Sequence, residues 1–108
     1  MTSSAITQDR MELAMDELAS TDEKVAELKT NVKRAEYLLK RKEAHAFVSS
    51  QGTVKDREAA SRLDADVVAA YDAHTDAMEE YERLEAKRKT WELVIDTWRT
   101  VEASRRRG

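Results

Sequence analysis

The chain has 108 residues, of which 38% are charged and 6% aromatic, and its net charge is −3. A chain of this length and composition is expected to form one domain, residues 1–108, and is too polar for a large globular core. It contains no cysteine, which excludes disulfide bonds and thiolate metal sites. No apolar run reaches the roughly 18–20 residues of a membrane helix and no secretion signal is recognisable, so a cytoplasmic protein is expected.

The composition favours helix along the whole sequence. Proline is absent, and alanine, glutamate, lysine, arginine and leucine are abundant. Long helices that each bury one apolar stripe suit such a chain, and they often complete that burial by associating with further copies. We therefore predict an all-α fold: a long antiparallel helical hairpin that resembles a coiled coil and assembles into a homo-oligomer.

The first helix is predicted over about residues 6–48. Its apolar residues alternate in steps of three and four and keep one heptad register. They are Met11, Ala14, Leu18, Val25, Leu28, Val32, Ala35, Leu39 and Ala46. Thr21 and Lys42 are polar interruptions of this register. The segment 20–23 resembles a capping box, so a kink or a new helix near Ser20 is the alternative to one continuous helix.

A turn is predicted over residues 49–53. Gly52 is the only internal glycine, and it is free to take the left-handed conformation that often ends a helix. Thr53 can cap the next helix, and Asp56, three residues further on, can return the hydrogen bond. The sequence therefore predicts a helix end followed directly by a helix start.

The second helix is predicted over about residues 54–103, followed by a basic tail over residues 104–108 that is expected to be disordered, like the first few residues of the chain. Two sets of residues recur at heptad spacing along this helix. One set is Ala60, Val67, His74, Tyr81, Arg88 and Ile95, and the other is Leu63, Ala70, Ala77, Leu84, Trp91 and Trp98. Tyr71 and Met78 widen the stripe beyond one seam, which indicates self-association.

Trp91 and Trp98 share a helix face with Ile95. Packing against Met11, Met15 and Ile6, or against a neighbouring copy, is favoured over base stacking, because aromatic side chains usually lie in cores and interfaces. The predicted packing or oligomer interface comprises Tyr71, Met78, Trp91, Ile95 and Trp98.

Charge is segregated along the chain. Residues 1–23 carry a net charge of −5, residues 24–62 of +5, residues 63–85 of −7 and residues 86–108 of +4. If the chain folds back at Gly52, residue i lies opposite roughly 103 − i, and blocks of opposite charge face each other, as in an antiparallel helix pair. Much of the positive charge therefore has a structural use.

A cluster of cations surrounds the predicted turn, and we call it the basic tip. Cations beside an aromatic ring suit the backbone and bases of a polyanion, and several copies together would multiply a weak affinity. A merely solvated, charged helix end is an equally weighted alternative. The candidate nucleic-acid-binding residues are Lys40, Arg41, Lys42, Phe47, Lys55, Arg57 and Arg62.

Nothing in the sequence indicates catalysis. His45 and His74 are far apart and lack further ligands at metal-binding spacing, so neither a metal nor a cofactor is predicted. Acidic pairs such as Glu79 and Glu80 are expected to be solvated, because a thin helical hairpin offers no dry pocket for general acid–base chemistry. No nucleophile constellation and no glycine-rich phosphate loop is present, which favours a non-enzyme.

The order of several short motifs resembles the UvsY family of phage recombination mediator proteins over about residues 25–108. The motifs are Lys42, Phe47, Ser49 and Gly52, then Asp56 and Arg57, then Leu63 to Val67, then Trp91 to Asp96, and finally the basic end with Gly108. The resemblance implies a ring-like homo-oligomer that binds single-stranded DNA and helps a recombinase displace the single-strand-binding protein, in the cytoplasm of a host cell.

The resemblance also implies that a Lys-x-Arg element before the turn contacts DNA. Only its lysine carries over, onto Lys42, because the arginine position is Ala44. Lys40 and Arg41 precede it and are the available substitutes. The acidic residues 1–23 have no counterpart in the family pattern.

A structural or adaptor hairpin that binds only protein partners is the alternative function. It would use its apolar seam or the face of Trp91 and Trp98. A small secreted hairpin of the Trp-x-Gly type is disfavoured, because the turn holds Gln51 and Gly52 without that tryptophan.

Overall fold

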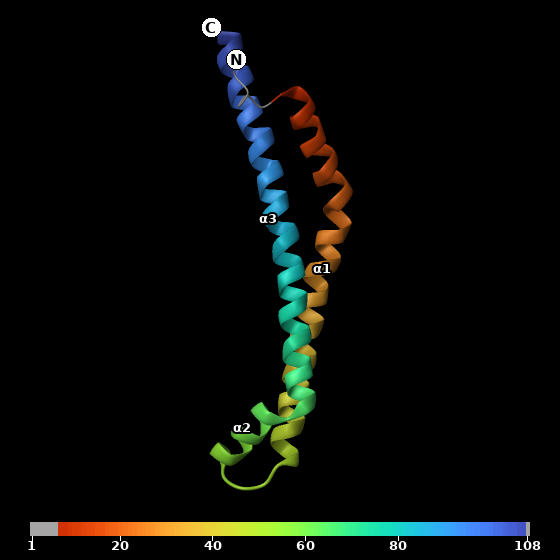
Figure 1. The fold of residues 1–108 in the computed structure, drawn as a ribbon, viewed down its shortest axis with the longest axis vertical. Coiled ribbons are helices and arrows are strands. Elements are labelled where there is room, and N and C mark those ends of the chain that lie inside the picture. Colours follow the sequence, from red (N-terminus) through yellow and green to blue (C-terminus); the bar gives the residue numbers. More distant parts are fainter. Residues whose placement is uncertain (1–6, 108) are drawn as a thin grey trace. The chain divides into compact units, whose positions relative to one another are not determined.

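The computed structural model describes residues 7–107, and within this range the chain is all-helical, as the sequence predicted. The three helices of the described part are α1 (Gln8–Ser49), α2 (Val54–Leu63) and α3 (Ala65–Arg107) (Figure 1). The expected start of the first helix at residue 6, the packing of Ile6, the disorder of the first few residues and the terminal Gly108 all concern positions outside the described residues.

Helix α1 runs without interruption through the segment that resembles a capping box. The Ser20 and Thr21 hydroxyls both donate to the backbone carbonyl of Glu17, at 3.2 and 2.6 Å. These side chains bond back to the preceding turn of the same helix, which is how serine and threonine are accommodated inside a helix. No new helix starts at Ser20, and the continuous reading is correct.

The turn between α1 and α2 has the predicted chemistry. Gly52 has φ of +108°, a backbone conformation that side-chain-bearing residues rarely adopt. The Thr53 hydroxyl accepts from the Asp56 backbone N–H at 3.2 Å, and the Asp56 carboxylate accepts from the Thr53 N–H at 3.1 Å. This reciprocal capping box fixes the start of α2.

The structure divides the second predicted helix at Asp64, where the sequence analysis expected continuity. Asp64 has ψ of 130° and leaves the helical conformation. Its carboxylate accepts from the N–H groups of Asp66 and Val67, at 2.9 and 3.2 Å, and so caps the start of α3. The short side chain of aspartate competes for backbone donors, and here that competition ends one helix and begins another.

The basic end also differs from the expectation, because α3 continues to Arg107 instead of ending near residue 103. Arg105 donates to Glu102 at 2.8 Å, one turn earlier. Cations in the last turn of a helix interact favourably with the negative end of its dipole. The residues expected to form a disordered tail are therefore helical as far as Arg107.

The chain forms two compact units. The first unit comprises the chain up to Val25 and from Glu82 onward. Its core is formed by Met11, Ala14 and Ile95, with Leu18, Trp91, Val94 and Trp98 packed against them. Met11 and Ala14 meet Ile95, while Thr21 meets Arg88, so the α1 and α3 parts of this unit are antiparallel.

The register of this antiparallel pair is shifted from the predicted one. A residue i lies opposite roughly 109 − i, about six positions from the expected 103 − i, judged from the contacts of Ala14 and Thr21. The sequence analysis placed the reversal of chain direction at Gly52 and assumed that the second helix runs back along the first directly after it. Residues 54–63 instead form the separate helix α2, so the return begins further along the chain.

The second unit comprises Ala26–Tyr81 and therefore contains the end of α1, all of α2 and the start of α3. Small and medium apolar side chains are buried in it, namely Leu28, Ala46, Val67 and Ala70. Ser61 on α2 is buried as well, and its hydroxyl donates to the Glu43 backbone carbonyl on α1 at 3.3 Å. This bond ties α2 to α1.

Replacing Asp64 by alanine is expected to lower the free energy of unfolding by about 1 kcal/mol, because two backbone N–H groups of α3 lose their acceptor. Asp64→Asn should retain most of the stability, since asparagine caps comparably. Thermal denaturation followed by circular dichroism measures both variants, with Asp72→Ala on the exposed side of α3 as the matched control. An Asp64→Ala variant as stable as the control would contradict the capping role.

Candidate nucleic-acid interface

All seven residues predicted for the basic tip lie in the second unit. Lys40, Arg41, Lys42 and Phe47 belong to the end of α1, and the other three, Lys55, Arg57 and Arg62, belong to α2. The turn that holds Gly52 connects these two helices. The structure therefore assembles the predicted residues in one unit, on two neighbouring elements.

The cations on α1 are occupied by neighbours on their own helix. The Lys40 ammonium lies 3.0 Å from the Glu36 carboxylate, one turn earlier. This hydrogen bond and the charge of Lys40 lower the pKa of Glu36. Arg41 is exposed and lies over the Tyr37 ring, 5.9 Å from its centroid. Lys42 is half-buried, so Lys40 and Arg41 are the more accessible charges of the three.

Phe47 and Arg57 form a pair between α1 and α2. The Arg57 guanidinium lies over the Phe47 ring at 5.7 Å from the centroid, and both residues are half-buried. The Arg57 Nε is buried and makes no hydrogen bond among the described residues. One face of the Phe47 ring is therefore engaged by the protein itself, which leaves less of it for base stacking than the sequence analysis assumed.

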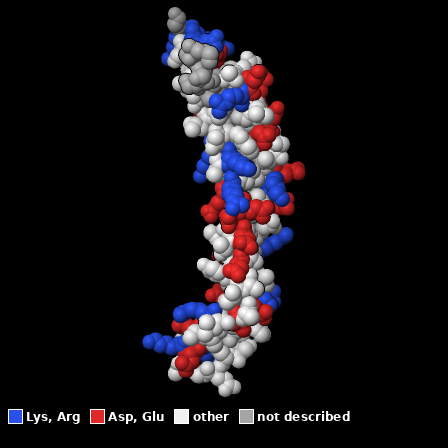
Figure 2. Space-filling model, in the orientation of Figure 1, with Lys and Arg blue, Asp and Glu red and all other residues white. Residues whose placement is uncertain are grey.

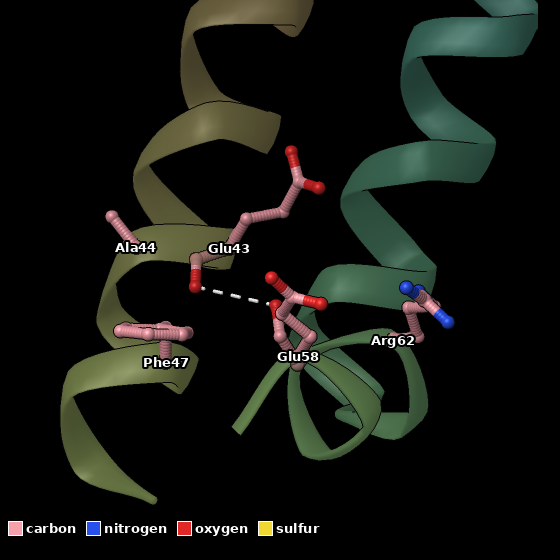
Figure 3. A pocket seen from close by; sticks show the side chains of 6 residues that line it. Glu43, Ala44, Phe47, Glu58 and Arg62 are labelled. Atoms are coloured by element: carbon pink, nitrogen blue, oxygen red, sulfur yellow. Dashed lines mark hydrogen bonds between the residues drawn. The ribbon is translucent and has the colours of Figure 1, made fainter. Parts of the chain in front are cut away.

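A hollow of about 340 Å³ lies beside this pair, between α1 and α2 (Figure 3). Its wall consists of Glu43, Ala44, Phe47, Glu58, Ser61 and Arg62. Figure 3 shows the side chain of Glu43 from α1 and those of Glu58 and Arg62 from α2. The hollow thus combines two carboxylates with one guanidinium, so its charge is mixed.

The surface of this end of the chain carries both signs of charge. On the face drawn in Figure 2, lysine and arginine side chains project around the α2 segment, with acidic side chains between them. Lys55 and Arg62 are exposed, and so are Asp56 and Glu58 on the same helix. Any polyanion would contact individual projecting cations there, because acidic groups interrupt the positive surface.

The predicted interface residues fall into two groups. Trp91, Ile95 and Trp98 lie in the core of the first unit, with Ile95 buried and the two tryptophans packed around it. Tyr71 and Met78 belong to the second unit, where their side chains remain 59% and 38% exposed. The tryptophans therefore have a packing role within the chain, and Tyr71 and Met78 are the most exposed of the five residues.

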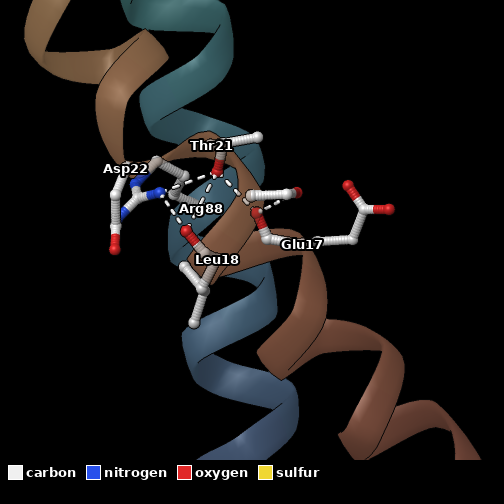
Figure 4. Close-up of polar contacts among 6 residues, drawn as sticks. Glu17, Leu18, Thr21, Asp22 and Arg88 are labelled. Carbon is white, nitrogen blue, oxygen red and sulfur yellow. Dashed lines mark hydrogen bonds and ion pairs between the residues drawn. The ribbon is translucent and has the colours of Figure 1, made fainter.

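Sequence analysis placed Arg88 on the apolar seam without assigning it a role. Its guanidinium reaches from α3 to α1, where it donates to the Leu18 carbonyl at 2.9 Å and the Thr21 hydroxyl at 2.7 Å (Figure 4). It also pairs with Asp22 at 2.6 Å, and only 14% of its side chain is exposed. The available signal was that Thr21 and Arg88 are both polar residues on the apolar seams.

Other kinds of site find no support in the described part of the chain. Residues 7–107 contain no group of three or more histidine, cysteine, aspartate or glutamate side chains arranged to hold a metal ion. The helices of the same range include none with an apolar segment that would cross a bilayer.

Comparison with known proteins identified no relative. No family model, no curated protein and no solved structure matches the chain.

The polar layer at Arg88 is expected to couple α1 and α3 energetically. Thr21→Val removes one acceptor of a largely buried guanidinium and should lower the free energy of unfolding by about 1–2 kcal/mol. In an Arg88→Met background the same change should cost much less, which gives a coupling energy of about 0.5–3 kcal/mol in a double-mutant cycle. Urea denaturation measures all four proteins.

Thr30→Val is the matched control, because the exposed Thr30 hydroxyl bonds only within its own helix, to Ala26. If the coupling energy of Thr21 with Arg88 is near zero and equals that of Thr30 with Arg88, the polar layer at Arg88 does not contribute to the pairing of α1 with α3.

Proposed function

We propose that the chain is a non-enzymatic protein that binds single-stranded DNA through the basic tip. One observation carries the proposal: the exposed cations Lys40, Arg41, Lys55 and Arg62 belong to the same unit as the half-buried Phe47, and Arg62 lines one hollow with it. Cations that contact phosphates, together with nearby rings, are the usual elements of sequence-independent binding to single strands.

The resemblance of the motifs to the recombination mediator family supports a more specific role. In that role the protein would hold a single strand by its phosphates while a recombinase replaces the single-strand-binding protein. The chemistry requires no reacting group, because the process exchanges one coating protein for another. Its physical requirement is an affinity that is moderate per copy and strengthened by several linked copies.

Self-association is part of this proposal. Tyr71 and Met78 are exposed apolar side chains on α3, and the proposed homo-oligomer buries them between copies of the helical hairpin. A homo-oligomer would present several basic tips to the same strand. Each tip then gains from the effective concentration created by its neighbours.

A triple Lys40→Ala, Arg41→Ala, Lys42→Ala variant is expected to weaken DNA binding and to reduce its dependence on salt. Each phosphate contact with a single strand contributes about 0.7 to the slope of log K against log salt concentration, so the loss of Lys40 and Arg41, with a smaller part from the half-buried Lys42, should reduce the slope by about 1–2. Titration of a fluorescent oligo-dT at several salt concentrations measures the change.

A second triple variant controls for the loss of charge itself. Lys87, Lys89 and Arg99 are exposed on α3 in the first unit, outside the basic tip. Their replacement by alanine should leave the slope close to that of the unaltered protein. Equal slopes for the basic-tip variant and the unaltered protein would contradict the proposed site.

A protein-binding adaptor is the second candidate function, and the extent of exposed apolar side chains favours it. Leu13 and Leu93 in the first unit are 60% and 65% exposed, and Tyr37 in the second is 65% exposed. If the chain is an adaptor that binds only protein, we expect no affinity for oligo-dT at any salt concentration. Truncation of Trp91 or Trp98 is not a clean test of this role, because both pack in the core of the first unit.

A further inference from the structure

A second hollow in the second unit, of about 290 Å³, opens between α1, α2 and α3. It is lined by Leu39, Glu43, Arg62, Val67, Val68 and Tyr71. Val67 is buried and Leu39 half-buried, whereas Val68 and Tyr71 are 47% and 59% exposed. We call this the Tyr71 groove. It has an apolar base and an apolar rim that faces solvent.

Two opposite charges flank the Tyr71 groove. Glu43 lies on α1 and Arg62 on α2, and both residues are exposed. Figure 3 shows their charged groups on separate elements. Within residues 7–107, neither charged group takes part in an ion pair, since the contact of Glu43 with Ser61 uses its backbone carbonyl. The groove therefore presents one acceptor and one donor beside apolar side chains.

We propose that the Tyr71 groove is a two-fold interface that binds the same groove of a second copy of this chain. In a two-fold interface residue i contacts residue j and residue j contacts residue i, so the surface must be complementary to itself. Glu43 and Arg62 meet this requirement, because Glu43 of one copy can face Arg62 of the other and the reverse pair forms by symmetry. Two Glu43–Arg62 pairs form, and Tyr71 and Val68 of both copies are removed from water.

The charge pattern favours a second copy over other occupants. An apolar groove alone would accept many amphipathic helices. A groove with one carboxylate and one guanidinium selects a partner with the reverse pair, and a second copy supplies that pair by symmetry. Tyrosine and arginine are also the residue types most often found to carry binding energy at interfaces. This inference depends on the self-association proposed above. It assigns Arg62 to the interface, which leaves Lys40, Arg41 and Lys55 as the exposed cations available to DNA.

Charge reversal tests the interface. Glu43→Arg alone places two cations opposite each other, and Arg62→Glu alone places two carboxylates opposite each other. Each single variant is expected to raise the dissociation constant of self-association by at least about tenfold, since like charges in contact oppose binding. A mixture of the two variants restores both opposite-charge pairs and should recover association close to that of the unaltered chain.

Sedimentation velocity over a range of concentrations measures association, and circular dichroism confirms that each variant is folded. Glu92→Arg and Lys89→Glu, exposed positions on α3 in the first unit, are the matched controls and should associate like the unaltered chain. Tyr71→Ser is a further variant without a charge change, and it should weaken association while the helical signal is retained.

The outcomes separate the two proposals. A monomer at every concentration overturns both self-association and the Tyr71 groove interface. An oligomer whose size and affinity are unchanged by Glu43→Arg and Arg62→Glu overturns the groove interface alone. An oligomer that is weakened by both single variants but not recovered on mixing also overturns it, because the two charges then do not meet across the interface.

Discussion

The narrowness of the apolar stripe on each helix is the constraint on which the rest of the structure depends. A helix buries such a stripe only by lying along another helix, and the antiparallel core of Met11, Ala14 and Ile95 is the result in the first unit. In the second unit, by contrast, most of the buried side chains are small, and Ser61 is among them. Such cores hold helices at close range, but leave many large apolar side chains on the surface.

A narrow stripe does not define its register well, because one heptad step resembles the next. The polar layer formed by Arg88, Thr21 and Asp22 adds the missing specificity in the first unit. A sliding of one heptad would leave a largely buried guanidinium without its acceptors, which is unfavourable in a low-dielectric environment. Single polar residues at apolar seams fix register in other helical assemblies in the same way.

The sequence predicted the helical class, the turn and the core of the first unit because these depend on local signals. Heptad spacing identified Ile95 and both tryptophans, and glycine followed by a Thr-x-x-Asp spacing identified the turn. The break at Asp64 was missed because the apolar register continues from Leu63 to Val67 without a slip. The one local signal was Asp64 itself, a residue type that favours helix starts, and its effect depends on whether its carboxylate turns to its own backbone.

The placement of the basic-tip residues in one unit was predictable, but not all of their contacts were. All seven basic-tip residues lie in the second unit, as their closeness to the turn required. The pairing of Lys40 with Glu36 and of Arg57 with Phe47 depends on side-chain orientation and on the angle at which α2 leaves α1. The spacing of four residues between Glu36 and Lys40 permits their pairing, whereas no residue spacing indicates the contact of Arg57 with Phe47. The structure consequently reduces the number of freely available cations and identifies the Tyr71 groove as a second surface.

The short length of α2 has a consequence for its order. A helix of ten residues is below the length at which helices persist alone in water, so its order depends on the two terminal caps and on the bond from Ser61 to α1. Among the three helices of residues 7–107, α2 is the shortest, and its order is therefore sensitive to the loss of any of these contacts. Because Arg57 belongs to α2, its position over the Phe47 ring of α1 adds a further contact that holds the short helix in place.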